Sequence, residues 1–411
     1  MAGVKILARF LVGNGMPVER LLCHPQSPLV AAFDGERPAV HVFDCGHSDL
    51  RPLASIGAHA AAYGEVDRWD RMLRDPFAAW NPVEPCLMAA IEATVWCWSP
   101  AEVSQVTGLP PDAAYEELVF SPDGRTLWAA PSSVDRCKAN AIDRTTGKVA
   151  VVDWYPWSVA HPAGGVVSTL MLNQGASHAL FARVDRARPA DRHVQRRAII
   201  LDNDAYLPAV FSPDGRYFAI RGNAYGETLD VFAFPSLEQV LRDEFNDGDW
   251  SRHDIVFGAK PGMLWVGTPT GALRSYDLAH DAATTEHGVL ADAPVTAMGA
   301  TSLGHLVIGC QNGEILLVSV PDGAAGDHPV DAPAMQAGVS AYLTGTEDVP
   351  DDVGDLESYL IVTDGERTWE PEDLETVTDA TSSDPSWLQL RAMYNGLFQD
   401  GPPQFRRPPA S

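Results

Sequence analysis

The chain has 411 residues, 45% of them hydrophobic and 20% charged, which is typical of a globular protein with a large buried core. Its formal net charge of −26 argues against nonspecific binding to DNA, RNA or an anionic membrane surface. No stretch approaches the roughly 18 consecutive apolar residues of a membrane-spanning helix, and the stretch from Met1 to Leu11 is a poor signal peptide.

The 34 Gly and 32 Pro make the chain turn-rich, which favours many short strands over long helices. The first strand is expected at residues 4–12, with no partner strand near it in sequence. Residues 21–56 then predict a set of four strands separated by turns, and the third of these ends on Phe43-Asp44.

Residues 58–80 depart from this strand pattern. Apolar residues recur there at spacings of three and four, which predicts a helical insertion between the first and second sets of strands. These residues are Val66, Trp69, Leu73, Phe77 and Trp80. Such a helix either caps the side of the fold or serves as a lid or partner-binding helix.

Two hexamers of identical sequence, Phe120 to Arg125 and Phe211 to Arg216, set the phase of a repeat. Each reads Phe-Ser-Pro-Asp-Gly-Arg, follows a valine and precedes a short apolar run. Pro fixes φ at the second turn position, and Asp and Gly suit the positions after it. Each hexamer therefore predicts the turn between the first and second strands of a repeat. They lie 91 residues apart, about twice the period of roughly 40–45 residues of a four-stranded propeller blade.

Seven sets of strands can be placed along the chain in this phase. Their first strands end near residues 22, 80, 119, 166, 210, 256 and 297. The spacing departs far from the period only across the insertion. The fourth set is expected to contain its first, second and third strands at residues 166–172, 178–184 and 193–201.

The seventh set lacks a fourth strand, whereas residues 4–12 lack a sheet. We expect the two to pair, because this pairing closes a ring and removes two exposed edges. The sequence thus predicts an all-β fold, a seven-bladed β-propeller of four-stranded antiparallel blades over residues 1–320.

Two later segments, Gly267 to Leu278 and Gly309 to Val320, resemble the second half of WD repeats. Tyr276-Asp277 and Phe43-Asp44 stand where that family usually has Trp-Asp, and the hexamers resemble the turn common in bacterial WD-like repeats. The resemblance covers residues 4–320 and implies a propeller that serves as an adaptor, a receptor or, in some members, an enzyme. The Gly-His pair typical of the family is missing from most blades, so the resemblance does not carry over the family's His–Asp hydrogen-bond network.

Residues 321–411 form an acidic extension. Between Glu347 and Asp384 there are 14 acidic residues and one basic residue, Arg367. The extension is either a solubilising tail or an acidic arm that docks on a basic partner or on a basic patch of this chain. A hairpin expected at residues 358–369 leaves eight blades as an alternative to seven.

A terminal helix is predicted at residues 385–395, with Asp384 as its N-cap, Pro385 at its first position and Gly396 as its stop. One face of this helix carries Trp387, Leu390, Met393 and Tyr394. That face is expected to dock on the propeller, and the alternative is that it binds another protein.

The most basic part of the chain is an arginine-rich segment, assigned to the loop between the second and third strands of the fourth set. Six arginines fall within fifteen residues there: Arg183, Arg186, Arg188, Arg192, Arg196 and Arg197. Arginine forks suit carboxylates and phosphates. The segment is therefore a solvated loop, a docking place for the chain's own acidic extension, or a site for an external anionic partner.

Trp154, Tyr155 and Trp157 are assigned to a connection between blades on the same face, where the central channel opens. Exposed aromatic side chains at such a place are frequent binding hot spots. The alternative is that they pack between the third and fourth blades. The candidate partner-binding residues are thus Trp154, Tyr155, Trp157, Arg183, Arg186, Arg188 and Arg192.

Signals for catalysis are weak. The sequence lacks the H-E-x-x-H, Gly-x-Ser-x-Gly, P-loop and G-x-G-x-x-G motifs, and its six cysteines are too scattered for a zinc site or a disulfide framework. We therefore assign no metal, cofactor or catalytic residue, and expect a reducing cytoplasm. The predicted function is a non-catalytic scaffold or recognition subunit that binds a protein partner through the channel face, with no nucleic-acid or membrane partner. The alternative is a propeller-fold lyase, isomerase or hydrolase acting on a small molecule at the channel mouth.

Overall fold

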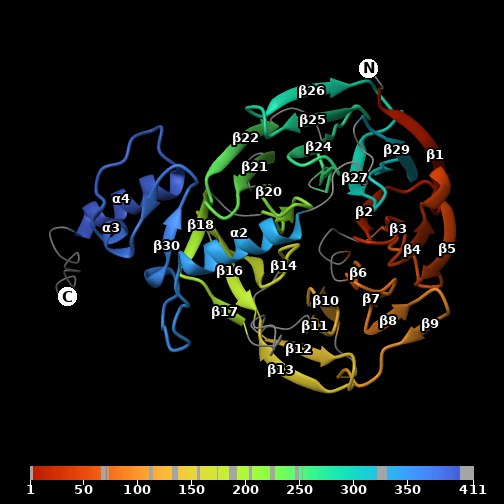
Figure 1. The fold of residues 1–411 in the computed structure, drawn as a ribbon, viewed down its shortest axis with the longest axis horizontal. Helices are drawn as coiled ribbons and strands as arrows, with labels where there is room; N and C mark the ends of the chain where they lie inside the picture. The colour runs from red at the N-terminus through yellow and green to blue at the C-terminus, as the bar shows by residue number, and fades with distance from the viewer. Residues whose placement is uncertain are drawn as a thin grey trace, which may run out of the picture.

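The computed structural model of the chain consists mostly of β-strands, arranged in seven sheets. It describes residues 3–65, 71, 74–110, 114–131, 138–154, 158–173, 175–184, 192–202, 206–222, 227–245, 250, 251, 253–321 and 331–398. Figure 1 shows the sheets following one another around a common centre, with β2, β6, β10, β14 and β27 on the inner side. The fold is all-β and propeller-like.

The first three sheets have four strands each, in chain order. They contain β2 (Val18–Cys23), β3 (Leu29–Asp34), β4 (Val40–Asp44) and β5 (Arg51–Ile56); β6 (Phe77–Trp80), β7 (Leu87–Ile91), β8 (Thr94–Trp98) and β9 (Val103–Gln105); and β10 (Tyr115–Phe120), β11 (Thr126–Pro131), β12 (Lys138–Asp143) and β13 (Val149–Asp153).

The fourth sheet is the largest. It contains β14 (Val159–Ala160), β15 (Val166–Asn173), β16 (Ala176–Val184), β17 (Arg192–Val194), β18 (Arg197–Asp202), β30 (Ile361–Thr363) and β31 (Thr368–Trp369).

The last three sheets again have four strands each. They contain β19 (Val210–Phe211), β20 (Tyr217–Arg221), β21 (Glu227–Ala233) and β22 (Gln239–Phe245); β23 (Ile255–Phe257), β24 (Met263–Gly267), β25 (Leu273–Asp277) and β26 (Ala283–His287); and β27 (Val295–Ala300), β28 (Leu306–Cys310), β29 (Glu314–Ser319) and β1 (Lys5–Leu11). The helical segments are η1 (Gly46–Ser48), α2 (Ala332–Thr344), η3 (Glu357–Tyr359), α3 (Pro371–Thr376) and α4 (Ser386–Phe398).

The N-terminal strand completes the last sheet. β1 pairs antiparallel with β29, in a register that runs from Lys5 opposite Ser319 to Leu11 opposite Glu314. This confirms the pairing predicted from the unpartnered strand at residues 4–12.

Each sheet shares a buried apolar cluster with the next sheet along the chain. The seventh and first sheets share one as well, which includes Val307 and Ile315 together with Val18 and Val30. The contact is close because β28 has Gly309, where a Cβ atom would lie 2.7 Å from Cγ1 of Val18. First and last sheets are thus packed against each other like any consecutive pair.

Both hexamers form the turn between the first two strands of a sheet, as predicted. Ser121 donates to Asp123 over 2.6 Å and accepts from the Thr126 amide over 2.9 Å. In the second hexamer Ser212 makes the same bond to Asp214 over 2.7 Å. The Asp and Ser side chains therefore brace the turn.

Three other first turns begin with a side chain that reaches the next sheet. His24 contacts the Glu84 carbonyl over 2.9 Å, Asn81 donates to the Gly124 carbonyl over 3.0 Å, and His161 contacts the Gly215 carbonyl over 3.0 Å. The opposite edge of each side chain accepts from amides of its own turn. We call these three contacts the turn relay.

The two histidine contacts of the turn relay require neutral imidazole rings. Nδ1 of His24 accepts from the amides of Gln26 and Ser27, so the ring proton lies on Nε2, where it is donated to the carbonyl. His161 is arranged in the same way. Burial lowers the pKa of both histidines below their ordinary value. Protonation would place a second N–H group against the turn amides.

The fourth sheet shows an error in the predicted phase. Its first strand is β14, and the turn from His161 to Gly165 leads into β15, so residues 166–173 form the second strand. The arginine-rich segment therefore connects the third strand, β16, to β17. Val184 donates to the Gly165 carbonyl over 3.0 Å, which places this end of β16 beside the first turn. The prediction that the segment joins the second and third strands, on the face opposite the hexamers, is wrong.

The predicted insertion ends earlier than expected. Phe77 and Trp80 lie in β6, the first strand of the second sheet, where Trp80 donates to the Leu22 carbonyl over 2.8 Å. In a strand, residues three apart point to opposite faces, so Trp80 packs against the first sheet and Phe77 against the third. Val66, Trp69 and Leu73 lie outside the described residues.

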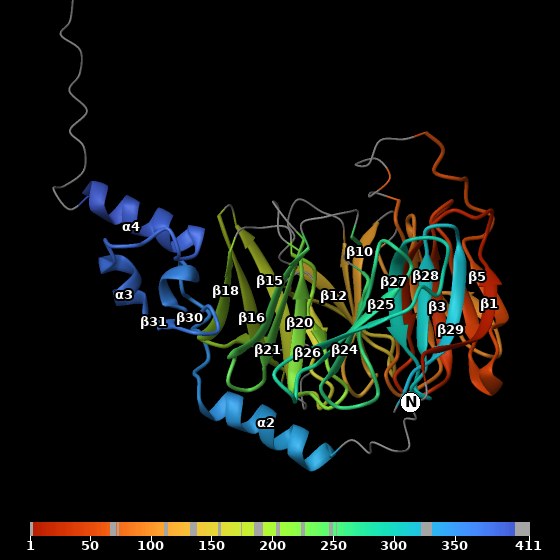
Figure 2. The same ribbon diagram turned by 90° about the horizontal axis from the view of Figure 1, so that it is seen from above.

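The hairpin expected at residues 358–369 joins the fourth sheet instead of starting an eighth. β30 pairs parallel with β18, and β31 pairs antiparallel with β30. Figure 2 shows α2 across one end of the sheets, whereas α3 and α4 lie at their side, beyond β30.

Removal of residues 1–13 is expected to lower the Tm by more than about 5 °C, because it uncovers one edge of β29 and takes Leu7 and Phe10 from their apolar cluster. Calorimetry measures this change, with removal of residues 399–411 as the control. An unchanged melting curve would contradict the role of β1.

The turn relay also predicts how stability depends on pH. The unfolded imidazoles titrate near pH 6.5 and the folded ones lower, so the unfolded chain binds more protons in between. Stability is therefore complete above about pH 6.5 and falls as the pH drops from there to the folded pKa values. The His24→Asn and His161→Asn double variant, which copies Asn81, should keep the contacts and lose this share of the pH dependence.

Urea unfolding at pH 7.5 and 5.5 measures the effect. His161→Ala serves as the comparison that removes the contact. It should lower stability by about 1 kcal/mol at pH 7.5 and by less at pH 5.5, where the parent protein has already lost part of this stabilisation. If the double Asn variant loses as much stability on acidification as the parent protein, the two histidines are not the groups responsible.

Candidate functional site

The described part of the arginine-rich segment binds the chain's own acidic extension. Arg183 donates through Nε to Asp348 over 3.3 Å and pairs with the same carboxylate through Nη2. Gln195 donates to Asp348 over 2.6 Å. The hydrogen bond from the Arg183 guanidinium holds the pKa of Asp348 below its ordinary value. Of the three interpretations of this segment, the structure shows docking of the extension.

Arg196 and Arg197 continue this docking. The Arg196 guanidinium donates to the Tyr359 carbonyl over 3.1 Å, lies 5.2 Å from the Tyr359 ring centre and reaches Glu370 at 3.6 Å. The Arg197 amide donates to Thr346 over 3.1 Å. Arg186 and Arg188 lie outside the described residues.

Trp154 is a core residue. It is 2% exposed, packs 6.0 Å from the Trp128 ring and donates to Glu117 over 2.8 Å. The Arg192 guanidinium lies 4.4 Å from the Trp154 ring centre. Trp154 therefore packs between the third and fourth sheets, and the expectation that it is exposed at a channel mouth is wrong. Tyr155 and Trp157 lie outside the described residues.

The extension is anchored to the outer edge of the fourth sheet. β30 continues that sheet beside β18, and Leu360, Val362, Leu374 and Trp387 share one buried cluster with its strands. α2 begins with Asp331 as its N-cap, and its Tyr342 hydroxyl donates to the Arg197 carbonyl over 2.6 Å.

The N-terminus of α4 is held by a residue of the fourth sheet. Ser386 donates to the Asp202 carboxylate over 2.5 Å, and the Trp387 amide donates to it over 3.3 Å. Asp384, predicted as the N-cap, instead accepts from Thr381 and Arg367, and these bonds lower its pKa to about 2. A carboxylate at a helix N-terminus also complements the helix dipole. α4 is thus fixed to β18 at one end.

α4 buries one face and exposes the other. Trp387, Leu388 and Ala392 are buried against the extension. The exposed fractions of the opposite side chains are 51% for Leu390, 59% for Met393, 58% for Tyr394 and 68% for Leu397. Of the four residues predicted to share one docking face, only Trp387 is buried, and Leu390, Met393 and Tyr394 are exposed. The helix also continues through Gly396 to Phe398, where a stop at Gly396 was predicted. We call the four exposed side chains the apolar strip.

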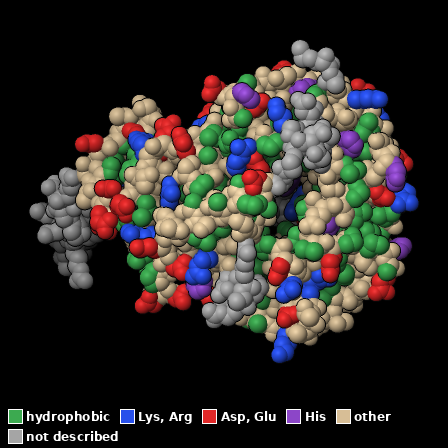
Figure 3. Space-filling model, viewed as in Figure 1, with side chains coloured by type: hydrophobic (Ala, Val, Ile, Leu, Met, Phe, Trp, Pro, Cys, Tyr) green, Lys and Arg blue, Asp and Glu red, His purple; other side chains and the backbone are tan. Residues whose placement is uncertain are grey.

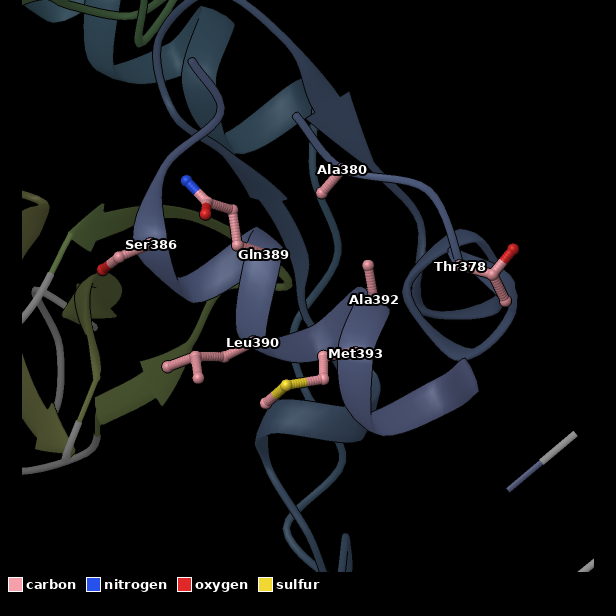
Figure 4. A pocket seen from close by; sticks show the side chains of 7 residues that line it. All are labelled: Thr378, Ala380, Ser386, Gln389, Leu390, Ala392 and Met393. Carbon is pink, nitrogen blue, oxygen red and sulfur yellow. The ribbon is translucent and has the colours of Figure 1, made fainter. Parts of the chain in front are cut away.

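A shallow open pocket of about 540 Å³ lies at one side of the apolar strip. It is lined by Thr378, Ala380, Ser386, Gln389, Leu390, Ala392 and Met393. Figure 4 shows Leu390 and Met393 side by side along α4, with Ala380 and Thr378 coming from the segment before the helix. The surface beside the strip therefore has a depression into which side chains of another molecule can insert.

The extension that carries the apolar strip is acidic. The 14 acidic residues between Glu347 and Asp384 stand against one arginine, and Arg367 contacts Asp364 and Asp384. Figure 3 shows Asp and Glu side chains spread over the extension. The site is an apolar surface on an extension of net negative charge, with one exposed arginine, Arg391, on α4 itself.

The sequence matches no protein-family model and no curated protein. Across the described ranges, no cluster of three or more His, Cys, Asp or Glu could hold a metal ion. Within the same part of the chain, no helix has the length and apolarity needed to cross a membrane.

Asp202→Ala is expected to loosen α4 without unfolding the sheets. Loss of a helix-capping carboxylate costs about 1 kcal/mol, so amides of α4 should exchange with solvent about fivefold faster. Hydrogen exchange measures this rate, with Asp379→Ala as the control at an exposed position. Equal exchange rates in the two variants would show that Asp202 does not hold the helix.

Proposed function

We propose that this chain is a non-catalytic protein-interaction module, in which a closed seven-bladed β-propeller carries a recognition helix, α4. The observation that carries the proposal is the apolar strip, which exposes four large side chains within eight residues of a helix anchored at its N-terminus. Exposed apolar patches of this kind on an otherwise polar surface are typical of protein-binding sites.

Support for the closed propeller comes from packing. Seven sheets share an apolar cluster with each neighbour, including the seventh with the first, and β1 supplies the outer strand of the seventh sheet. The resemblance to WD repeats agrees with this arrangement. Such a ring is a rigid mount, because each sheet is held on both faces.

Recognition through the extension is favoured over the channel face. The aromatic residue described there, Trp154, is buried, and Arg183 and Arg196 contact acidic residues of the extension. These arginines serve to position the extension on the fourth sheet. The surface left for a partner is on the outward side of α4.

The partner should be a protein segment with an apolar face bordered by Lys or Arg. The apolar strip favours a partner that removes its side chains from water, and the net negative charge of the extension attracts positive charge and repels negative charge. An amphipathic helix of basic character satisfies both conditions.

Two synthetic amphipathic helices with the same apolar face test this proposal, one bordered by Lys and the other by Glu. The Lys-bordered peptide should bind to the full chain, more weakly at high salt because screening reduces the attraction. Leu390→Glu with Met393→Glu should weaken binding at least about tenfold, since a buried charge costs more than 1.4 kcal/mol. Fluorescence anisotropy measures both affinities.

Val151→Glu is the control variant, because Val151 is 71% exposed on β13, far along the chain from the extension. Equal affinity for the two peptides would contradict the proposal. So would a loss of affinity in Val151→Glu as large as the loss in the double variant of α4. A concentration-dependent dimer that Leu390→Glu dissociates would assign the strip to self-association instead.

A further inference from the structure

Two cysteines of the second sheet lie within reach of each other. Cys86, which directly precedes β7, and Cys97 in β8 are free thiols with their Sγ atoms 3.3 Å apart. β7 and β8 pair with Met88 opposite Cys97, so both sulfur atoms lie on one face of the sheet. A disulfide needs the two atoms to approach by about 1.3 Å more, to a separation of about 2.0 Å.

A guanidinium group lies beside this pair. Arg144 places Nη2 3.7 Å from Cys86 Sγ, while its Nη1 contacts Glu84 at 3.1 Å and the Gly124 carbonyl at 3.2 Å. These contacts fix the cation beside the sulfur atoms. Cys86 is buried, whereas Cys97 is half-buried.

The two thiols differ in acidity. A hydrogen bond from Cys86 and, to a smaller extent, the nearby Arg144 lower the pKa of Cys97 to about 7, against the opposing effects of burial, Glu102 and Glu84. The same hydrogen bond and burial raise the pKa of Cys86. At pH 7 the half-buried Cys97 is therefore partly a thiolate, whereas the buried Cys86 keeps its proton.

We propose that Cys86 and Cys97 form a redox-reactive dithiol, which a hydroperoxide oxidises to an intramolecular disulfide. This modification site is independent of the function proposed for α4. The proposal rests on the sulfur–sulfur contact, on the neighbouring Arg144 and on the unequal exposure of the two thiols.

The reaction proceeds in two steps. The Cys97 thiolate attacks one oxygen of hydrogen peroxide, the O–O bond breaks, and hydroxide leaves and is protonated to water; Cys97 becomes a sulfenic acid. The Cys86 sulfur, after giving up its proton, then attacks the Cys97 sulfur. The S–S bond forms, the S–O bond breaks and a second water leaves. Two thiols and one peroxide thus give one disulfide and two waters.

The test treats the reduced full-length chain with hydrogen peroxide at pH 7. The expected product has lost two of its six thiols and about 2 Da of mass, and dithiothreitol reverses both changes. Protease cleavage after Glu92 should leave two peptides joined through Cys86 and Cys97. Cys86→Ser should instead leave Cys97 as a sulfenic acid that dimedone labels.

The pair Cys23 and Cys45 provides a matched control. Burial raises the pKa of both thiols, that of Cys45 to about 12, so Cys23→Ser and Cys45→Ser should leave the oxidation unchanged. The proposal is overturned if the lost thiols map to other cysteines, or if Cys97→Ser oxidises as fast as the parent chain.

Arg144→Met tests the contribution of the cation. A pKa that rises by about one unit lowers the thiolate fraction of Cys97 at pH 7 about fivefold, so alkylation by iodoacetamide should slow by that factor. Arg144→Lys should retain most of the rate. Equal rates in all three proteins would remove Arg144 from the proposal.

Discussion

The hydrogen bonds of the turn relay fix how the sheets sit against each other at three of the contacts between neighbouring sheets. His24, Asn81 and His161 each use one edge to complete their own turn and the other to reach the carbonyl of the next turn. A side chain that bonds on both edges fixes the distance and the angle between two sheets at once. Apolar packing alone is less directional, because it depends mainly on area.

The extension is positioned by the packed sheets, above all by the fourth sheet. Its strand β30 lengthens the fourth sheet, its carboxylates meet the arginines of that sheet, and α4 is capped by Asp202, 184 residues from Ser386. Much of the chain's negative charge is therefore held at one place instead of spread along a solvated tail. The arrangement presents the apolar strip in a defined direction.

The sequence predicted the parts of the fold that repeat. Two identical hexamers fixed the phase of the repeat. The unpaired strand at residues 4–12 matched the seventh set, which lacked a fourth strand. The first strand of the fourth sheet was not predicted, because β14 has only two residues. The turn after it reads His-Pro-Ala-Gly-Gly, whereas the hexamers read Ser-Pro-Asp-Gly-Arg after their phenylalanine. The relay was visible only as His-Pro and Asn-Pro pairs at residues 24, 81 and 161, which sequence reasoning passed over.

The candidate site was harder to predict because its contacts are distant in sequence. Trp154 was assigned to a surface because nothing local shows that Arg192 and Trp128 cover it. Apolar residues lie all around α4, so its pattern alone does not say which side docks. The proximity of Cys86 and Cys97 could have been inferred from the sequence, because a hairpin that turns at Glu92-Ala93 places both on one face of the sheet.

The pairing of β1 with β29 has a consequence for synthesis of the chain. Arg9 and Glu314 meet across 305 residues, so the first strand leaves the ribosome long before its partner exists. At translation rates of about 5–20 residues per second, this delay is about 15–60 s. During that time a nascent chain carries an apolar strand without a sheet, a segment of the kind that chaperones bind. β1 can pair only after the seventh sheet has been made.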